Sequence, residues 1–495
     1  MDLVEAGAVT PAAGQRSATG PLTTGLLPAQ GGLEVVTYEA AGLGDRSYLV
    51  HDGRTAAVID PQRDPAPYLT TAEDLGLEIS AVLETHIHND YVSGGLALAR
   101  RTGASYGIPA GETVAFSAEC VPLAEGDQLS VGELTVKVLS TPGHTPHHLS
   151  YLVEGASGTG VVLTGGSLLA GATGRTDLFG KDEAPKLAAA QWRSVRRLLE
   201  QLPPETTVLP THGFGSFCSA GPAAAGQATA VSIETERQRN PVAVLQLAAF
   251  VESLVLDPPP IPAYYVHIAP QNRAGALEPG YGPVPRLAPA SLPPLLRSGT
   301  AIVDLRQRRI FAADHWPGAV NMEVGPSLTT YLGWLIPFTA PVVVISQSVE
   351  DTLEARHLLA RIGREALAGW TAADDVLTLI DAVERAQYPV AGFHDLAARS
   401  RQGALPTVVD VRFPHEWRAG HIRGARNVPV PEFGAFSLTL PGTPDEIWVH
   451  CAAGYRAAIA ASLLSSQGLR PVLVDDTFDN AVAAGLEIVV PASHS

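Results

Sequence analysis

Three loops of this chain place a histidine directly after a short apolar strand, and this arrangement restricts the fold more than any other feature. The first loop, Glu84–Tyr91, reads Glu-Thr-His-Ile-His-Asn-Asp-Tyr and follows the apolar run Ala81–Leu83. The other two loops carry His144 and His212. A loop leaving a strand can direct several side chains at one point, and imidazole and carboxylate groups bind metals. The sequence therefore predicts loops that converge on a metal centre.

The candidate ligands of this centre come from a His-x-His-x-Asp pattern and a Thr-Pro-Gly-His turn: His86, His88, Asp90 and His144. A second group could orient these ligands or bind the metal directly: His212, Asp60 and Tyr91. Cys218 follows His212 in a Gly-Phe-Gly-Ser loop, so it is either a second sulfur-accepting thiol or a packed side chain. Cys120 has no cationic neighbour in the sequence, which favours a structural role.

Two later segments of the chain share one plan, which indicates a duplicated domain. Each has a strand ending in Asp-x-Arg, a Gly-Ala turn leading to an asparagine, a second apolar strand and then a helix. The Asp-x-Arg patterns are Asp304-Leu-Arg306 and Asp410-Val-Arg412. Strands alternating with helices in units this short predict small parallel α/β sheets.

The second copy ends its apolar strand at His450 and continues with a cysteine-containing loop: Cys451, Ala452, Ala453, Gly454, Tyr455 and Arg456. Small residues let such a loop direct backbone N–H groups inward, and the helix that follows adds its positive end. Both effects favour a thiolate, and Arg456 can hold an anionic sulfur donor. We therefore expect Cys451 to attack sulfane sulfur and carry it as a persulfide. The first copy has Ser346 at this place and no evident base beside it, which predicts a docking or spacing module.

Charge and composition exclude several classes of partner. The chain has 33 basic and 50 acidic residues, a formal net charge of −17 over 495 residues. Such a surface repels nucleic acid and anionic lipid, so we expect neither as a partner. No segment has the apolar length of a membrane helix or signal peptide, and three cysteines cannot form a disulfide framework. These features predict a cytoplasmic protein.

The segment of about 390–485 resembles the rhodanese domain, in which a cysteine opening such a loop accepts sulfur. The matching residues upstream are Asp410-Val-Arg412, Glu416, His421-Ile-Arg-Gly424 and Asn427. The six-residue loop resembles that of sulfur-specific members. One departure is Asp475-Asp476, where the family usually has glycines. The middle copy resembles a rhodanese domain without the catalytic cysteine.

The histidine-bearing segments resemble the metallo-β-lactamase fold, and the domain order resembles persulfide dioxygenase/rhodanese fusion proteins. The matching segments are Asp60-Pro-Gln-Arg-Asp64, His86–Asp90, Thr141-Pro-Gly-His144 and Gly174-Arg-Thr-Asp177. The resemblance implies an α/β and α+β multidomain chain, with an N-terminal αββα sandwich followed by two rhodanese-like α/β domains. The expected ranges are a flexible tail at 1–32, the sandwich at 33–250, a Pro-rich connector at 251–285, and rhodanese-like domains at 286–385 and 390–495.

The resemblance also implies one Fe(II) per chain, held by His86, His144 and an aspartate. The position of that aspartate is Gly166 here, and Tyr91 replaces a histidine that dinuclear hydrolases use for a second metal. Three outcomes stay open: Asp90 or water completes an altered iron site, His88 joins His86 and His144 in a zinc-like site, or the domain binds no metal.

Together these features predict an enzyme of sulfane-sulfur metabolism and sulfide detoxification. It would oxidise a low-molecular-weight persulfide at iron and transfer sulfur through Cys451, with thiosulfate and sulfite as further substrates or products. A homodimer or a homotetramer is compatible with this interpretation. The alternatives are a sulfurtransferase with a non-catalytic binding domain, a metallo-hydrolase of the glyoxalase II type, and a non-enzymatic persulfide sensor.

Overall fold

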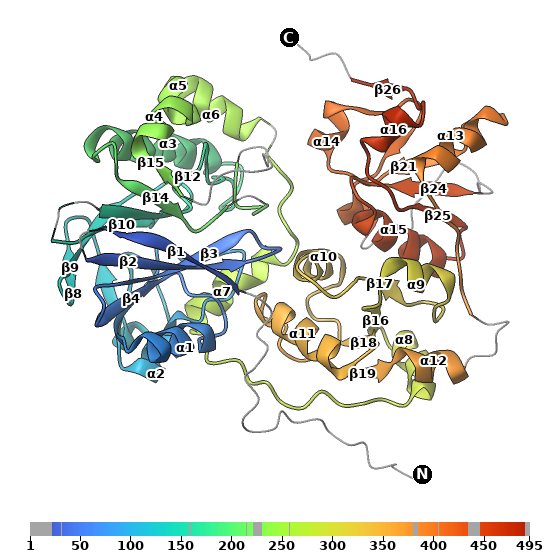
Figure 1. Ribbon diagram of the computed structural model, residues 1–495, viewed down its shortest axis with the longest axis horizontal. Helices are drawn as coiled ribbons and strands as arrows, with labels where there is room; N and C mark the ends of the chain where they lie inside the picture. Colours follow the sequence, from blue (N-terminus) through green and yellow to red (C-terminus); the bar gives the residue numbers. More distant parts are fainter. Residues whose placement is uncertain are drawn as a thin grey trace. The chain divides into compact units, whose positions relative to one another are not determined.

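The computed structural model describes residues 22–30, 32–156, 158, 160–213, 215–220, 230–256, 258–379, 385–403, 405–433 and 446–490. As far as they are described, these residues divide into two compact units (Figure 1). The first unit includes Ser17–Gly280 and His357–Glu365, and the second includes Tyr281–Arg356 and Ala366–Ser495.

The first unit contains two large β-sheets. The seven-stranded sheet has its strands in sequence order: β1 (Leu22–Gln30), β2 (Leu33–Ala40), β3 (Asp45–His51), β4 (Thr55–Ile59), β5 (Glu78–Leu83), β6 (Ser105–Pro109) and β7 (Val121–Leu123). The six-stranded sheet has the order β15-β14-β11-β10-β9-β8: β8 (Gln128–Val131), β9 (Leu134–Ser140), β10 (Leu149–Glu154), β11 (Gly160–Gly165), β14 (Thr207–Pro210) and β15 (Val231–Ser232). A small hairpin joins β12 (Leu168–Leu169) to β13 (Ala172–Thr173).

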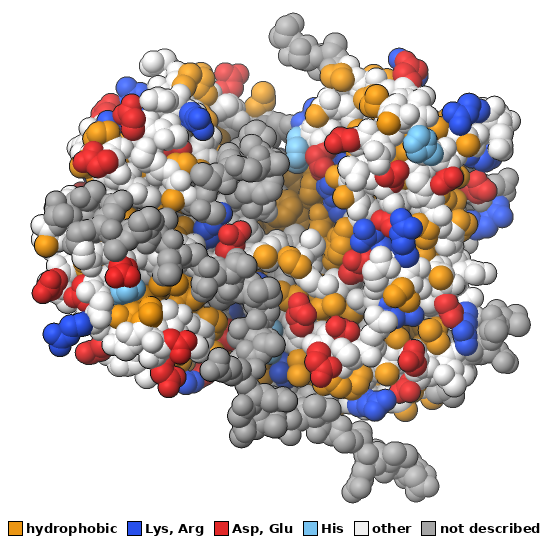
Figure 2. Space-filling model, in the orientation of Figure 1, with side chains coloured by type: hydrophobic (Ala, Val, Ile, Leu, Met, Phe, Trp, Pro, Cys, Tyr) orange, Lys and Arg blue, Asp and Glu red, His pale blue; other side chains and the backbone are white. Residues whose placement is uncertain are grey.

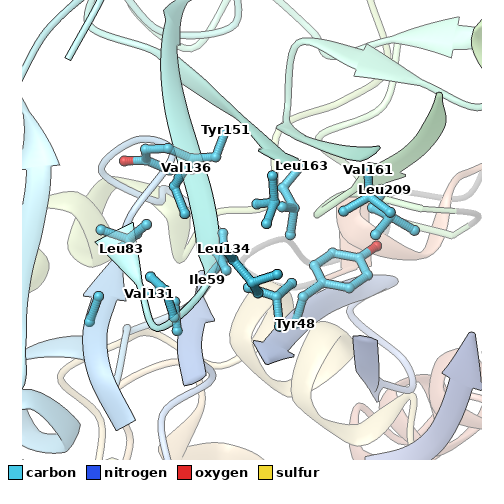
Figure 3. Close-up of a cluster of buried hydrophobic side chains, with 14 of the residues drawn as sticks. Tyr48, Ile59, Leu83, Val131, Leu134, Val136, Tyr151, Val161, Leu163 and Leu209 are labelled. Atoms are coloured by element: carbon cyan, nitrogen blue, oxygen red, sulfur yellow. The ribbon is translucent and has the colours of Figure 1, made fainter. Parts of the chain in front are cut away.

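The inner faces of the two sheets form one apolar core (Figure 3). Alternate residues of β9 point into it, namely Leu134, Val136 and Val138, because successive side chains of a strand face opposite sides. Tyr48 and Leu83 enter the same core from the seven-stranded sheet. This packing fixes the ends of both sheets and therefore the loops that leave them.

Helices cover the outer faces of both sheets (Figure 1). Helices α1 (Ala66–Leu75) and α2 (Gly95–Thr102) pack on the seven-stranded sheet through residues such as Tyr68 and Leu96. The six-stranded sheet packs against the following helices: α3 (Ala184–Gln201), α4 (Ile233–Arg239), α5 (Pro241–Val244) and α6 (Leu247–Val255). The expected αββα sandwich is therefore confirmed.

The second unit contains two small parallel sheets, one for each repeat. The first has the order β17-β16-β18-β19: β16 (Ala301–Asp304), β17 (Val320–Asn321), β18 (Val342–Ser346) and β19 (Gly369–Ala372). Its helices are α8 (Leu292–Arg297), α9 (Arg308–Ala313), α10 (Leu328–Leu335), α11 (Val349–Ala360) and α12 (Ala373–Leu379).

The second sheet has the order β20-β25-β24-β21-β23: β20 (Val390–Ala391), β21 (Thr407–Asp410), β23 (Arg426–Asn427), β24 (Ile447–His450) and β25 (Pro471–Val474). A separate pair joins β22 (His421–Ile422) to β26 (Ile488–Val489). The helices of this repeat are α13 (Phe393–Arg401), α14 (Pro414–Ala419), α15 (Tyr455–Ser466) and α16 (Asn480–Ala483). The predicted pair of small parallel α/β sheets is therefore present.

The two repeats share their strand register. At the carboxyl ends of the two central strands, these residues are paired: Asp304 with Ile345 in the first repeat, and Asp410 with His450 in the second. Ser346 and Cys451 each come directly after the paired residue, so they occupy equivalent positions in the two repeats.

Two segments are more ordered than the sequence suggests. Strand β1 begins at Leu22 and pairs antiparallel with β2, although a tail was expected up to residue 32. The Pro-rich range 251–285 contains helix α7 (Tyr265–Ala274), which includes Pro270. In both cases contacts with the rest of the first unit override a local composition that is poor in periodicity.

Surface features of the described residues bear on the expected partners. No described helix is long and apolar enough to cross a membrane. Acidic and basic side chains are interspersed over the face drawn in Figure 2.

Candidate metal centre and sulfur-transfer site

The three histidine-bearing loops meet at one buried point. His86 follows β5, His144 follows β9 and His212 follows β14, and all three side chains are inaccessible to solvent. One ligand atom of each lies within 4.8 Å of the other two. His86 and His144 were expected as ligands, whereas His212 was expected either to orient ligands or to bind.

Hydrogen bonds define the protonation of two of these imidazoles. His144 Nδ1 lies 2.7 Å from the carbonyl oxygen of Arg175, which can only accept, so Nδ1 carries the hydrogen. His212 Nδ1 lies 2.9 Å from a carboxylate oxygen of Asp45 and donates in the same way. The Nε2 atom of each ring therefore has a free electron pair, and that of His144 is buried without a hydrogen-bond partner.

His86 is oriented by a short relay. Its Nδ1 lies 2.8 Å from the hydroxyl of Thr85, and that hydroxyl donates to Asp60 over 2.7 Å. The hydroxyl therefore accepts from His86 Nδ1–H, so Nε2 of His86 is unprotonated and has a free electron pair. This atom lies 3.4 Å from His212 Nε2. Two electron pairs that face each other repel unless a cation lies near them.

Burial lowers the pKa of His86 and of His144 well below the usual value for histidine, and the neighbouring imidazoles add to this effect. Neutral imidazole is the form that binds metals. Each ring also donates a hydrogen bond from its Nδ1–H to an oxygen, as metal-binding histidines usually do. The donor set of His86, His144 and His212 fits a single metal ion.

His88 has a different environment. Its Nε2 lies 3.3 Å from Asp60 Oδ1 and 3.2 Å from Glu84 Oε2. Burial opposes protonation of this ring, but the two carboxylates outweigh it and raise the pKa of His88 well above its usual value. Its Nδ1 is buried without a hydrogen-bond partner. His88 therefore pairs with carboxylates through the nitrogen that faces them.

Asp90 is another buried carboxylate of this region, and its oxygens accept no hydrogen bond from the described residues. Its Oδ2 lies 3.2 Å from His212 Nδ1. Burial, with the nearby carboxylate of Asp45, raises the pKa of Asp90 to about 6. Burial also raises the pKa of Asp45 to about 7. Asp90 therefore lies buried against His212 and close to the Asp45 carboxylate.

The glycine at the expected aspartate position has a steric consequence. A Cβ atom on Gly166 would lie 2.2 Å from Cδ2 of His144, closer than any real contact allows. The His144 ring thus occupies the space in which a side chain at residue 166 would begin. His212 supplies a third imidazole to the cluster, with a ligand atom within 4.8 Å of those of His86 and His144.

Tyr91 supports the histidine loop. Its hydroxyl donates to the carbonyl of Asp60 over 3.0 Å and lies 3.0 Å from His88 Nε2, and burial raises its pKa well above the usual value. Asn272 of α7 adds a contact that could not be predicted from the sequence pattern. Its amide donates to the carbonyls of His88 and Tyr91, both over 2.9 Å.

Cys218 is fully buried. Its thiol donates to the hydroxyl of Tyr265 at 3.6 Å, and burial raises the pKa of this thiol well above its usual value. A thiol that resists ionisation is a poor nucleophile. This environment favours the packed role over the sulfur-accepting one.

The second chemical site lies at the end of β24. Cys451 is 2% exposed, and the backbone N–H of Gly454 donates to its Sγ over 3.1 Å. Gly454 has a φ of +89°, a left-handed conformation that favours glycine, and helix α15 begins at the next residue, Tyr455. The carbonyl of Ala452 accepts from the N–H of Phe478 over 2.9 Å, which anchors the loop.

Arg456 forms a buried pair with Glu416. Its two terminal nitrogens donate to the two carboxylate oxygens over 2.5 and 2.8 Å. Burial alone would raise the pKa of Glu416, but Arg456 outweighs it and lowers this pKa. The guanidinium is therefore held by a carboxylate on one side and contributes positive charge behind the loop.

The middle repeat offers no comparable nucleophile. The Ser346 hydroxyl is buried, donates to the carbonyl of Ser348 over 2.9 Å and lies 2.7 Å from the hydroxyl of Thr352. None of these partners is a base.

Comparisons with known proteins agree with this architecture. The model of the metallo-beta-lactamase superfamily matches residues 43–212, and that of the rhodanese-like domain matches residues 393–480. A hydroxyacylglutathione hydrolase from Cereibacter sphaeroides is 35% identical over 188 residues, which are 37% of this chain and 68% of that protein.

Two solved structures are also similar. A metallo-beta-lactamase from Staphylococcus aureus subsp. aureus COL has 25% identity and a TM-score of 0.61, and the match covers 69% of this chain and 99% of that chain. ETHE1 from Myxococcus xanthus has 32% identity and a TM-score of 0.41, and the match covers 48% of this chain and 97% of that chain.

Proposed function

Because the chain belongs to the metallo-β-lactamase superfamily and carries a rhodanese-like domain, we propose that it is an enzyme of sulfane-sulfur metabolism. Cys451 transfers sulfur, and the histidine cluster holds a metal at which a low-molecular-weight thiol persulfide is oxidised. The observation that carries the proposal is the hydrogen bond from the Gly454 N–H to the Cys451 sulfur. A fixed backbone donor beside a helix N-terminus stabilises both the thiolate and the persulfide anion.

Sulfur transfer at Cys451 proceeds in two displacements. The thiolate attacks the outer sulfur of thiosulfate, the S–S bond of the donor breaks, and sulfite leaves with the bonding electron pair. A thiol, sulfite or cyanide then attacks the outer sulfur of the Cys451 persulfide, and the thiolate is released again. No net oxidation occurs in this exchange.

The histidine cluster supports the oxidative half of the proposal. His86, His144 and His212 would hold a redox-active metal such as Fe(II), which would supply O2 activation for conversion of RSS⁻, O2 and H2O into RS⁻, SO3²⁻ and two protons. The chain orients the three rings through Thr85, Asp45 and the Arg175 carbonyl. Burial of the whole cluster excludes bulk water from the reacting atoms.

The sulfur-transfer half is tested by substitution of the nucleophile. Cys451→Ser should reduce thiosulfate:cyanide sulfurtransferase activity to background, because a hydroxyl does not replace the thiolate. Cys120→Ser is a matched control, since Cys120 is half-buried in the first unit and should leave the activity unchanged. Activity retained in Cys451→Ser would contradict the assignment.

The metal half is tested by metal content. His212→Ala should lower the metal bound per chain in anaerobically purified protein, since it removes one of three imidazole donors. His51→Gln is the control, because His51 is buried in the same unit and its Nδ1 accepts from Gly53. Full metal content in His212→Ala would exclude His212 as a ligand. A wild-type chain without stoichiometric metal would reduce the first unit to a binding module.

A hydrolase of the glyoxalase II type is the second candidate. Three neutral imidazoles are also a ligand set of catalytic zinc, whose bound water ionises near neutral pH. The similarity to hydroxyacylglutathione hydrolase points the same way. Persulfide-dependent O2 uptake with iron supports the dioxygenase, whereas thioester hydrolysis with zinc and no O2 uptake supports the hydrolase.

A further inference from the structure

The turn of the catalytic loop rests on a carboxylate. A Cβ atom on Gly454 would lie 2.2 Å from Oδ1 of Asp475, so this carboxylate packs directly on the Gly454 backbone. Asp475 follows β25, and its side chain is 6% exposed.

Two arginines of the middle repeat hold this carboxylate. Arg308 Nε donates to Asp475 Oδ1 over 2.6 Å, and Arg309 Nε donates to Oδ2. Arg309 also donates through Nη2 to the Asp475 carbonyl over 3.2 Å. Arg308 in turn pairs with Glu323 of its own repeat through Nη1 at 3.0 Å. Both carboxylate oxygens of Asp475 are therefore fixed from the other repeat.

The middle repeat also contacts the helix that begins at the loop. The Tyr455 hydroxyl donates to the carbonyl of Glu323 over 3.3 Å, and the Tyr455 and Tyr331 rings lie 5.8 Å apart. Further along α15, the Ser462 hydroxyl accepts from the Asn321 N–H over 3.0 Å. Helix α15 is thus seated on the repeat that lacks a cysteine.

We propose that Arg308 and Arg309 are positioning residues for sulfur transfer at Cys451, acting through Asp475 on the Gly454 turn. The proposal rests on the proposed sulfur-transfer function of Cys451. The arginines hold Asp475 against one side of Gly454, and the N–H of Gly454 donates to Cys451 on the other. The middle repeat therefore completes the site of its neighbour.

Charge gives the arrangement a second effect. An unpaired carboxylate beside the loop repels a thiolate and an anionic sulfur donor, whereas the two guanidinium groups neutralise it. The other charged groups at the loop, Arg456 and Glu416, already form their own pair. Removal of the arginines would leave Asp475 uncompensated beside the loop, and would also leave Glu323 without its partner Arg308.

A charge-cancellation series tests this inference in the full chain. The variants are Arg308→Gln/Arg309→Gln, Asp475→Asn and the triple combination, with Arg385→Gln as the control. Arg385 pairs with Asp314 in the middle repeat and has no contact with the Cys451 loop among its described bonds. The readouts are kcat and KM for thiosulfate:cyanide transfer, melting temperature, and alkylation of Cys451 by iodoacetamide resolved by peptide mass spectrometry.

The double arginine variant should lose between about 10- and 100-fold in kcat/KM, since a misplaced catalytic group costs this much. Alkylation of Cys451 should slow as well. The triple variant should recover part of the loss, because it also removes the Asp475 charge, although Glu323 still lacks its partner. Losses that merely reflect weaker packing would instead accumulate in the triple variant.

Unchanged transfer and alkylation in the double variant would overturn the proposal, and so would a triple variant no better than the double. If the double variant fails to fold, Arg309→Gln replaces it, since the Arg309 side chain is 60% exposed. Wild-type protein without sulfurtransferase activity would refute the proposed function instead. The alkylation rates would still decide the positioning role.

Discussion

The two repeats of the second unit share a buried framework and differ in the loop at its end. In each, an arginine two residues after an aspartate donates to it through Nε over 3.0 Å: Arg306 to Asp304, and Arg412 to Asp410. An asparagine amide then joins two carbonyls of the same segment, from Asn321 in one repeat and Asn427 in the other. The same hydrogen-bonded framework is therefore present in the repeat that has a cysteine in the following loop and in the repeat that has none.

The loops differ in length and in donors. Cys451 is followed by a left-handed glycine whose N–H reaches the sulfur, before α15 begins at Tyr455. Ser346 leads to α11 at Val349, and its hydroxyl is engaged by Ser348 and Thr352. The two repeats therefore share one α/β framework, whereas the loop that directs an N–H at a sulfur atom is present in the second repeat.

Moving the nucleophile from the second repeat to the middle repeat should have the largest effect. The double variant Cys451→Ser/Ser346→Cys should have background sulfurtransferase activity, because position 346 has no glycine turn to hold an anion. Ser346→Cys alone should keep wild-type activity. Turnover of thiosulfate with cyanide by the double variant would show that the framework, rather than the loop, makes the site.

The shared framework should have a similar effect on stability in both repeats. Arg306→Met and Arg412→Met each remove the guanidinium partner of a buried aspartate, which should cost about 3–5 kcal/mol of unfolding free energy. Arg412→Met should have the larger effect, because the Arg412 guanidinium also lies 3.6 Å from the Phe478 ring centroid. Chemical denaturation measures both.

The exposed pair Arg423–Glu487 provides the control, and Arg423→Met should change the unfolding free energy little. A loss in only one of the two buried variants would show that the repeats do not share a common framework.

The smallest effect should be on the pH dependence of stability, at the position where the second repeat has His450 and the middle repeat has an aliphatic residue. Burial lowers the pKa of His450 to about 4, and the equivalent residue is Ile345. Between this value and the unfolded value of about 6.5, the unfolded chain binds more protons. The contribution of His450 is complete above pH 6.5 and is lost as the pH falls towards 4, at about 1.4 kcal/mol per pH unit.

His450→Ile should therefore flatten the pH dependence of the unfolding free energy over this window. His315 of the middle repeat has a pKa lowered by burial to about 4 and should keep its own contribution in this variant. If the unfolding free energy of wild type and of His450→Ile changes with pH at the same slope, His450 is not the group that causes this dependence.

Much of the fold follows from sequence pattern, because strand ends and the repeat are local signals. The histidine loops and the Cys451 loop each come directly after an apolar strand, and the structure places them there. The early start of β1 at Leu22 and the helix α7 could not be predicted, because each depends on a tertiary partner rather than on its own periodicity.

The chemical detail was less accessible. The proposed ligand role of His212 depends on where its Nε2 electron pair points, which the Asp45 hydrogen bond fixes from a distant strand. The pairing of Arg456 with Glu416 likewise joins two helices. The acidic pair at 475–476 was visible as a departure from the family pattern, but its arginine partners come from another repeat.

The proposal that Cys451 carries sulfur as a persulfide is tested by peptide mass spectrometry of the protein after incubation with thiosulfate. We predict one added sulfur on the peptide that contains Cys451, and cyanide should remove this sulfur. The peptides that contain Ser346, Cys120 or Cys218 should carry none. Thiocyanate formation without sulfur on Cys451, or with sulfur on another cysteine, would contradict it.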